Sequence, residues 1–172
     1  MIKKLVYTKD NKIKSYIFKK GKNMKKLLTL GNVVKACAVL FALVAFFLMF
    51  SDQLYVELLG NRGYVKFDDA FFSDNGAPIS FVGYLLVLIA GLAVCVLVFL
   101  PLEAKLKKFI SFGLAVLLVL GAVFIFIEAA VVNGDGNAYH LTAGPVIAGI
   151  LAILAGIAVC LAEFLPEKQL VK

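Results

Sequence analysis

Apolar residues along the chain gather into four runs separated by polar connections. The runs are Leu27–Phe50, Ile79–Leu100, Phe109–Ile127 and Pro145–Leu165. Each has about 18 to 25 residues, the length that an α-helix needs to cross roughly 30 Å of hydrocarbon. Pro78 and Pro101 bracket the second run and Pro166 closes the fourth, as is typical of helix boundaries. The pattern predicts an all-α integral membrane protein, a four-transmembrane-helix bundle built from two tandem helical hairpins.

The first polar connection, Ser51–Pro78, is too long to be a bare turn. Two β-prone runs, Leu54–Leu59 and Tyr64–Phe67, flank Gly60–Gly63, whose glycines suit a tight reversal. The sequence therefore predicts a small β-hairpin in this loop. A lone hairpin is only marginally stable in water, so we expect it to rest on the helix ends or on a partner.

The domain organisation follows from these runs. Residues 1–26 form a basic tail, residues 27–108 a first transmembrane hairpin with outer loop 51–78, and residues 109–172 a second hairpin with outer loop 128–142. The second outer loop contains Asn133–Asn137, a turn-forming cluster. In the tail, Met24-Lys-Lys-Leu-Leu is also typical of a bacterial start, an alternative under which residues 1–23 are not native.

Basic residues divide unequally between the two predicted sides. The tail with Lys35, the connection 102–108 and the C-terminal segment carry 16 basic residues, whereas the two outer loops carry Arg62 and Lys66. The positive-inside rule predicts that both termini are cytoplasmic. We expect the tail to lie near anionic lipid head groups, and the Lys35 side chain to extend towards the nearer membrane surface.

Composition supports a membrane protein and narrows its source. The chain is 62% apolar and 17% charged, and its mean hydropathy is +0.96, which excludes an ordinary soluble domain. Lysine dominates the basic residues and tryptophan is absent, as is common in AT-rich bacterial genomes. We expect a multi-pass protein of a bacterial plasma membrane. The net charge of +7 suggests nucleic acid in a soluble protein, but no aromatic-interleaved binding fold accompanies it, so no nucleic-acid partner is expected.

Two apolar runs share a sequence that indicates an internal duplication. Ala90–Glu103 aligns with Ala155–Lys168, with eight of fourteen positions identical. Apolar helices also resemble one another by composition, which is the alternative explanation. A duplication would relate the two hairpins by a pseudo-two-fold axis along the membrane normal.

Small residues mark where helices are expected to pack closely. They fall near one face of the second run and one face of the fourth: Gly91, Cys95, Gly149, Ala152, Gly156 and Cys160. We expect the second and fourth helices to meet near the predicted axis, with Gly91 and Gly156 at the closest approach.

The sequence offers no catalytic, cofactor or metal motif. A Gly-rich phosphate loop, a Ser/His/Asp set, HExxH and CxxC are all missing. The second outer connection contains or adjoins three candidate metal ligands, Glu128, Asp135 and His140, but their spacing matches no known metal-binding motif. We expect Glu128 to lie at the membrane interface. Glu163, near the end of the fourth run, is expected to pair with lysine or to contact lipid or a partner. We therefore expect no enzyme activity, no cofactor and no bound metal.

Four helices with a larger, β-prone first outer loop give a topology similar to that of claudin-like tetraspan proteins. The likeness is architectural, because the tryptophan and paired cysteines of their first outer loop are absent, and it implies no residue role or function here.

The predicted function is a scaffold or accessory subunit that presents the first outer loop to a membrane-protein partner or to a second copy. The alternative is a small transporter or pore component that acts as an oligomer. Predicted lipid or partner contacts are Glu163, Phe71, Phe72 and Tyr64.

Overall fold

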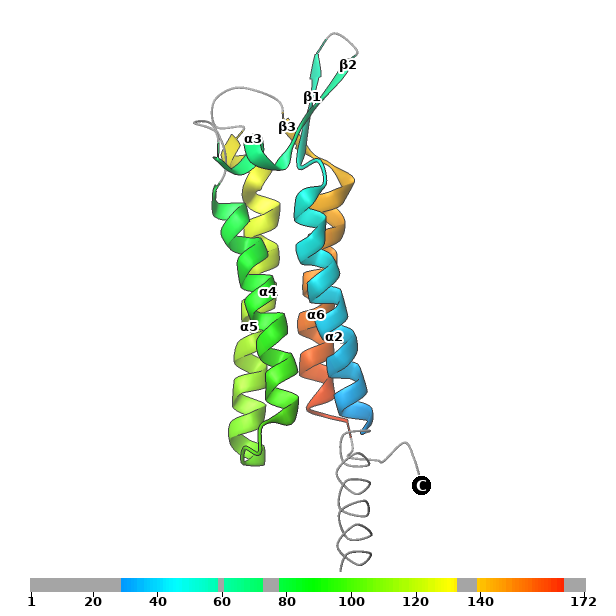
Figure 1. Cartoon of the computed structure of the whole chain (residues 1–172), viewed down its shortest axis with the longest axis vertical. Coiled ribbons are helices and arrows are strands. Elements are labelled where there is room, and N and C mark those ends of the chain that lie inside the picture. Colours follow the sequence, from blue (N-terminus) through cyan, green and yellow to red (C-terminus); the bar gives the residue numbers. More distant parts are fainter. Residues whose placement is uncertain (1–28, 59–60, 73–77, 133–138, 166–172) are drawn as a thin grey trace, which may run out of the picture.

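Four long helices form an antiparallel bundle in the computed structural model, which describes residues 29–58, 61–72, 78–132 and 139–165 (Figure 1). The helices are α2 (Leu30–Phe47), α4 (Pro78–Phe99), α5 (Ala104–Val132) and α6 (Ala143–Ala162). Each is long and apolar enough to cross a membrane, which confirms the four helices predicted from the apolar runs. Around the bundle the order is α2, α4, α5 and α6, so that α2 also contacts α6.

The ends of the helices differ from the apolar runs most clearly at α5. This helix starts at Ala104 and continues to Val132, whereas the sequence predicted connections at 102–108 and from Glu128 onward. Lysine and glutamate end an apolar run but are good helix formers, so the helix extends through them. At the other end of the bundle, α2 continues into a short 3₁₀ helix, η1 (Leu48–Phe50).

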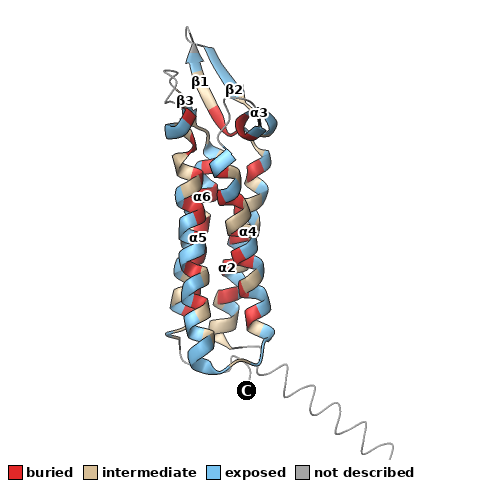
Figure 2. Cartoon of the chain, turned by 90° about the vertical axis from the view of Figure 1, so that its left-hand side faces the viewer, coloured by how far each residue is buried: buried red, intermediate tan, exposed pale blue. Residues whose placement is uncertain are grey.

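Buried residues lie on the sides of the helices that face one another, and exposed residues lie on the outside (Figure 2). Many of the buried side chains are small, whereas large apolar side chains are exposed on the outside. Alanines are fully or almost fully buried on all four helices: Ala38, Ala42, Ala45, Ala90, Ala115, Ala122, Ala148, Ala152 and Ala155. By contrast, Ile89 on α4 is 60% exposed and Val116 on α5 is 66% exposed. Close approach of small residues is the usual way in which helices associate where apolar solvent gives them no hydrophobic drive.

A three-stranded antiparallel sheet lies at one end of the bundle, which we call the sheet end (Figure 1). Its strands are β1 (Leu54–Leu58), β2 (Asn61–Val65) and β3 (Tyr139–Leu141), in the order β2-β1-β3. The predicted β-hairpin is confirmed as β1 and β2. The third strand was not predicted, and it joins the second outer connection to the first.

The register of the hairpin corrects the predicted position of its turn. Leu58 pairs with Asn61 and Glu57 pairs with Arg62, so Asn61–Gly63 belongs to β2 and not to the reversal. Residues 59–60, which connect these partners, lie outside the described part of the chain, as does the turn predicted at Asn133–Asn137.

The sheet and a short helix, α3 (Phe67–Phe72), rest on the helix ends. Leu54 is buried among partly buried neighbours that include Val65 and Leu141. On α3, Phe71 is only 2% exposed, with ring centroids 6.0 Å from both Phe81 and Tyr84. Phe71 is therefore not accessible as the lipid or partner contact that the sequence predicted, because this ring packs into the core. Phe72 is 63% exposed.

The predicted contact between the second and fourth helices is also wrong. A Cβ at Gly91 would meet Ala42 of α2, and a Cβ at Gly156 would meet the carbonyl oxygen of Ala115 on α5. Cys95 is exposed on the outside of the bundle and Cys160 is half-buried. Helices α4 and α6 lie diagonally across the bundle, so the small residues of each face its neighbours on the ring.

The closest backbone approach joins α4 to α5 through two glycines that the sequence analysis did not select. A Cβ at Gly83 would lie 2.7 Å from the Gly121 carbonyl oxygen, and a Cβ at Gly121 would lie 2.8 Å from the Gly83 carbonyl oxygen. Of the predicted packing residues, Gly149 faces Phe126 of α5 and Ala152 is fully buried.

Candidate functional site

A buried ion pair joins three helices at the end of the bundle opposite the sheet, which we call the loop end. The Lys35 ammonium of α2 pairs with Oε1 of Glu163, and the Ser111 hydroxyl of α5 donates to the same oxygen at 2.7 Å. The Lys35 and Glu163 side chains are 5% and 9% exposed. Lys35 therefore does not extend to the surface as predicted, and Glu163 has the lysine partner that was one of its predicted roles.

The surroundings of Glu163, the residue that ends α6, favour its charged form. Burial alone raises the pKa of this carboxyl, but the hydrogen bonds from Lys35 and Ser111, together with the charges of Lys35 and Lys107, outweigh burial and lower the pKa below its ordinary value of 4.5. Glu163 is therefore ionised at neutral pH, and its interactions connect α2, α5 and the end of α6.

Beside the ion pair, the loop end contains a pocket of about 310 Å³. The first turn of α2 and the first turn of α5 line it, together with the end of α6. Three lysines, Lys35, Lys107 and Lys108, contribute to the lining against one acid, Glu163. Lysines and the starts of two helices make this pocket electropositive.

A second buried polar group lies at the sheet end, where Gln53 follows η1. The Tyr84 hydroxyl of α4 donates to Oε1 of Gln53 at 3.0 Å, and the Gln53 amide donates to the carbonyl oxygens of Met49 and Ser51, each at 2.7 Å. Both side chains are fully buried. This network fixes the start of β1 to α4, so Tyr84 is a structural residue and not the surface anchor that its position near a helix end suggests.

Glu128 of α5 is buried close to this network and is not interfacial as predicted. The residue has no exposed surface, and neither of its carboxylate oxygens has a hydrogen-bond partner among the described residues. The Ser80 hydroxyl of α4 is near enough to form a weak hydrogen bond with the carboxyl, and Tyr84 is near enough to interact with it electrostatically. A buried carboxyl with so little hydrogen bonding is destabilising, since it has lost its water without regaining as many hydrogen bonds.

Glu128→Met is expected to stabilise the protein by about 1–3 kcal/mol, the usual cost of leaving a buried polar group unsatisfied. Methionine keeps the length of the side chain and removes the two unpaired oxygens. Thermal unfolding of the purified protein in detergent measures the change. A lower unfolding temperature for Glu128→Met than for the natural chain would show that the carboxyl has a stabilising partner.

The upper face of the sheet carries polar and aromatic side chains on all three strands. Tyr55 pairs with Tyr64 across β1 and β2, and with His140 across β1 and β3. The Arg62 guanidinium lies 5.1 Å from the centroid of the Tyr55 ring, and its Nε donates to Glu57 at 3.2 Å. We call Tyr55, Glu57, Arg62, Tyr64 and His140 the aromatic face.

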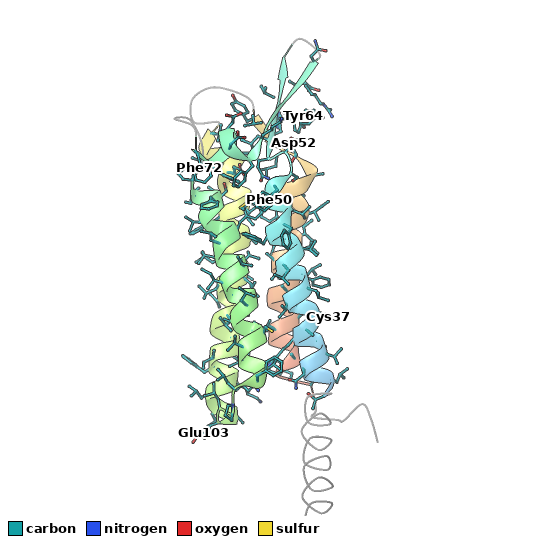
Figure 3. The ribbon with its side chains drawn as sticks, viewed as in Figure 1. Cys37, Phe50, Asp52, Tyr64, Phe72 and Glu103 are labelled. Atoms are coloured by element: carbon teal, nitrogen blue, oxygen red, sulfur yellow. The ribbon has the colours of Figure 1, made fainter. Side chains whose placement is uncertain are left out.

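The aromatic face borders a shallow pocket of about 400 Å³ that reaches the first residues of α6. Tyr55, Arg62 and Tyr64 line its upper wall, and Asp52 and Thr142 lie at its base. Figure 3 shows Tyr64 and Asp52 together at the sheet end, far from Glu103 at the loop end. Tyr64 is 57% exposed, so its predicted position as a contact residue agrees with an accessible side chain.

One further surface of the bundle is apolar. An apolar groove of about 460 Å³ runs between α5 and α6, with Val116, Val119, Ile157 and Leu161 along it. Within the described ranges, no three His, Cys, Asp or Glu side chains gather as a metal site requires. Cys37, Cys95 and Cys160 are free thiols.

Sequence reasoning predicted a lysine partner for Glu163, but it missed the burial of Lys35 and the Gln53–Tyr84 hydrogen bond because it treated polar residues near helix ends as surface residues. Lys35, Ser111 and Gln53 each interrupt or adjoin an apolar run, and such residues are costly unless they are paired inside the bundle. The position of these polar residues in or beside apolar runs could therefore have indicated buried pairing. The partner of each residue depends on how the helices pack. No protein-family model, curated protein or solved structure matches the chain significantly.

Proposed function

We propose that the protein is a non-enzymatic scaffold or accessory subunit of the bacterial plasma membrane, which presents its sheet end to a protein partner outside the cell. Insertion is supported by the outer surface of the four helices. Large apolar side chains are exposed along them, for example Leu40 at 60%, Ile89 at 60% and Val116 at 66%. A continuous apolar surface of this kind is expected to contact lipid or another membrane protein.

The orientation rests on the charges at the two ends of the bundle. Lys105, Lys107 and Lys108 lie at the loop end, whereas the sheet end carries Arg62 and Lys66 among several acids. By the positive-inside rule the loop end and both termini are cytoplasmic, and the sheet lies outside.

The aromatic face is the observation that carries the proposed function. Tyrosine and arginine are enriched at the centres of protein interfaces, since they combine large contact areas with hydrogen bonding. Here two tyrosines, one arginine and one histidine share one side of a sheet, and its other side is held by the buried residues Leu54 and Val132. A rigid, exposed face needs little ordering when a partner binds.

The sheet joins the two outer connections into one surface, because β1 pairs with both β2 and β3. A partner that contacts Tyr64 on β2 therefore also contacts His140 on β3. We infer that the partner is the outer domain of a membrane protein that offers carbonyl, carboxylate or aromatic groups to Arg62 and the tyrosines.

Site-specific photocrosslinking tests this proposal in native membranes. A photoreactive residue in place of Tyr64 should capture one defined protein, whereas the same residue in place of Lys66, which is exposed but outside the aromatic face, should not. With the reactive residue at His140, Arg62→Ala should reduce capture about 30-fold or more, the effect of losing a residue that contributes 2 kcal/mol or more. Equal capture from positions 64 and 66 would contradict the proposal.

Capture of a second copy of this chain at Tyr64 would identify the partner as the protein itself. Solute flux through proteoliposomes then separates the scaffold from the alternative, a transporter or pore component. Flux that depends on the reconstituted protein would favour the alternative, and its absence beside specific capture would support the scaffold.

A further inference from the structure

We infer that the loop end binds one anionic glycerophospholipid of the inner leaflet, with its phosphate headgroup in the basic pocket and an acyl chain in the groove between α5 and α6. The inference rests on the membrane insertion and orientation in the proposed function. The pocket and the groove are separate observations, and each accounts for one half of such a lipid.

The basic pocket suits a phosphate group. Lys35, Lys107 and Lys108 line it against Glu163, and Oε1 of that carboxylate already accepts bonds from Lys35 and Ser111. Among the described residues, the balance is two positive charges in about 310 Å³. Basic pockets between helices on the cytoplasmic side are the usual sites for anionic lipid headgroups.

Helix ends add to this electropositive environment. Thr29, Gly31 and Asn32 at the start of α2 and Ala104 at the start of α5 line the same pocket. The Thr29 hydroxyl already accepts from the Asn32 N–H at 3.3 Å, and the end of α6 also reaches the pocket. The remaining first-turn N–H groups of α2 and α5 nevertheless lack partners within their own helices, and both helix dipoles favour an anion there. Two helix starts and three lysines thus surround one space.

The apolar groove lies further along α5 and α6 than the pocket, and the edge-to-face rings of Phe112 and Phe164, with centroids 6.0 Å apart, lie between the two levels. On α6, Cys160 and Leu161 line the groove, and the next two residues, Ala162 and Glu163, line the pocket. On α5, Lys108 lines the pocket, and Ala115, two helical turns further along, lines the groove. The groove extends along α5 from Ala115 to Val123, about 12 Å at the rise of an α-helix, away from the cytoplasmic end.

This arrangement has the polarity of an inner-leaflet lipid, with charge at the membrane surface and an apolar channel towards the bilayer centre. A free phosphate would occupy the pocket alone, and a second copy of the chain would cover the groove alone. An anionic phospholipid uses both, which is why we assign it as the occupant.

Native mass spectrometry of the full-length protein, released from detergent micelles with added lipid, tests the assignment. Dioleoyl phosphatidylglycerol should bind with a stoichiometry of one and more tightly than dioleoyl phosphatidylcholine. Lys108→Gln should weaken phosphatidylglycerol binding about fivefold, the effect of about 1 kcal/mol per lysine. Lys105→Gln removes the same charge from the same turn of α5, outside the pocket, and should leave the affinity unchanged.

Three results would overturn the assignment. Equal weakening by Lys105→Gln and Lys108→Gln would show general attraction to a basic surface. Displacement of phosphatidylglycerol by glycerol phosphate at an equal concentration would show that the chains contribute nothing and that a soluble phosphate is the ligand. If Ile157→Trp, which fills the groove, abolishes a dimer but leaves lipid affinity unchanged, a second copy covers the groove.

Failure of this test is distinguishable from failure of the proposed function. If the protein captures no partner at Tyr64, lipid binding can still be measured independently, because the aromatic face and the pocket lie at opposite ends of the bundle. Incorporation of the protein into phosphatidylcholine nanodiscs is measured beforehand. A protein that does not insert into a membrane would fail to incorporate.

Discussion

Lys35→Met should destabilise the bundle by about 3–5 kcal/mol, because it leaves the Glu163 carboxylate buried without its cation. The Ser111 hydroxyl, which also donates to this carboxylate, cannot neutralise the charge. Thermal or denaturant-induced unfolding in detergent measures the loss. Lys105→Met is the matched control, since Lys105 is exposed at the same end of the bundle and has no ion-pair partner among the described residues.

The double variant Lys35→Met/Glu163→Met separates the cost of an orphaned charge from the value of the pair. Replacing both partners by apolar side chains of similar length is often neutral or stabilising, so the double variant should recover most of the stability. A double variant as unstable as Lys35→Met alone would show that packing around Lys35, and not its charge, holds the helices.

The same ion pair gives the protein a specific acid sensitivity. Because the pKa of Glu163 is lowered in the folded state, its contribution to stability is complete above the ordinary value of 4.5 and is lost progressively as the pH falls below it. The double variant should lack this part of the acid destabilisation, and an unchanged pH profile would contradict the assignment.

Gly121→Ala should destabilise the protein by about 1–3 kcal/mol, the usual cost of overpacking a tight contact. The added Cβ would lie 2.8 Å from the Gly83 carbonyl oxygen and 2.7 Å from Cγ2 of Val87, so the backbones of α4 and α5 would have to separate. Gly83→Ala meets the Gly121 carbonyl oxygen at 2.7 Å and should have a similar effect.

Gly113 provides the control for this prediction on the same helix. A Cβ there would meet nothing within 4 Å, so Gly113→Ala should be neutral or slightly stabilising. Unfolding of the three variants side by side makes the comparison. Equal effects of Gly113→Ala and Gly121→Ala would show that helix propensity, and not the close approach of α4 and α5, determines the result.

The sequence predicted the four helices because each is one long apolar run, and hydropathy reports that directly. It also predicted the β1–β2 hairpin from β-prone residues near two glycines. The third strand was missed because Tyr139–Leu141 is too short to show a period, and its pairing with β1 joins residues about half the chain length apart. The internal duplication stays a prediction.

The sequence could not predict which helices pack against each other, for a physical reason. Every helix carries small residues, so a stripe of glycine and alanine shows that a helix packs closely without showing which neighbour it packs against. Gly91 and Gly156 contact α2 and α5 respectively, and the backbones of α4 and α5 approach closely at Gly83 and Gly121 instead. Likewise, Lys35 and Glu163 are far apart in the sequence, and only the α2–α6 contact brings them together.

Thiol labelling in intact cells tests most directly the claim that the sheet end faces outward from a membrane-inserted bundle. In a variant without the native cysteines, Asn61→Cys on β2 and Lys105→Cys on α5 place single thiols at opposite ends. A membrane-impermeant maleimide should label position 61 in intact cells, and position 105 only after the cells are permeabilised. Labelling of position 105 but not 61 in intact cells would contradict the orientation, and labelling of both would contradict insertion across the membrane.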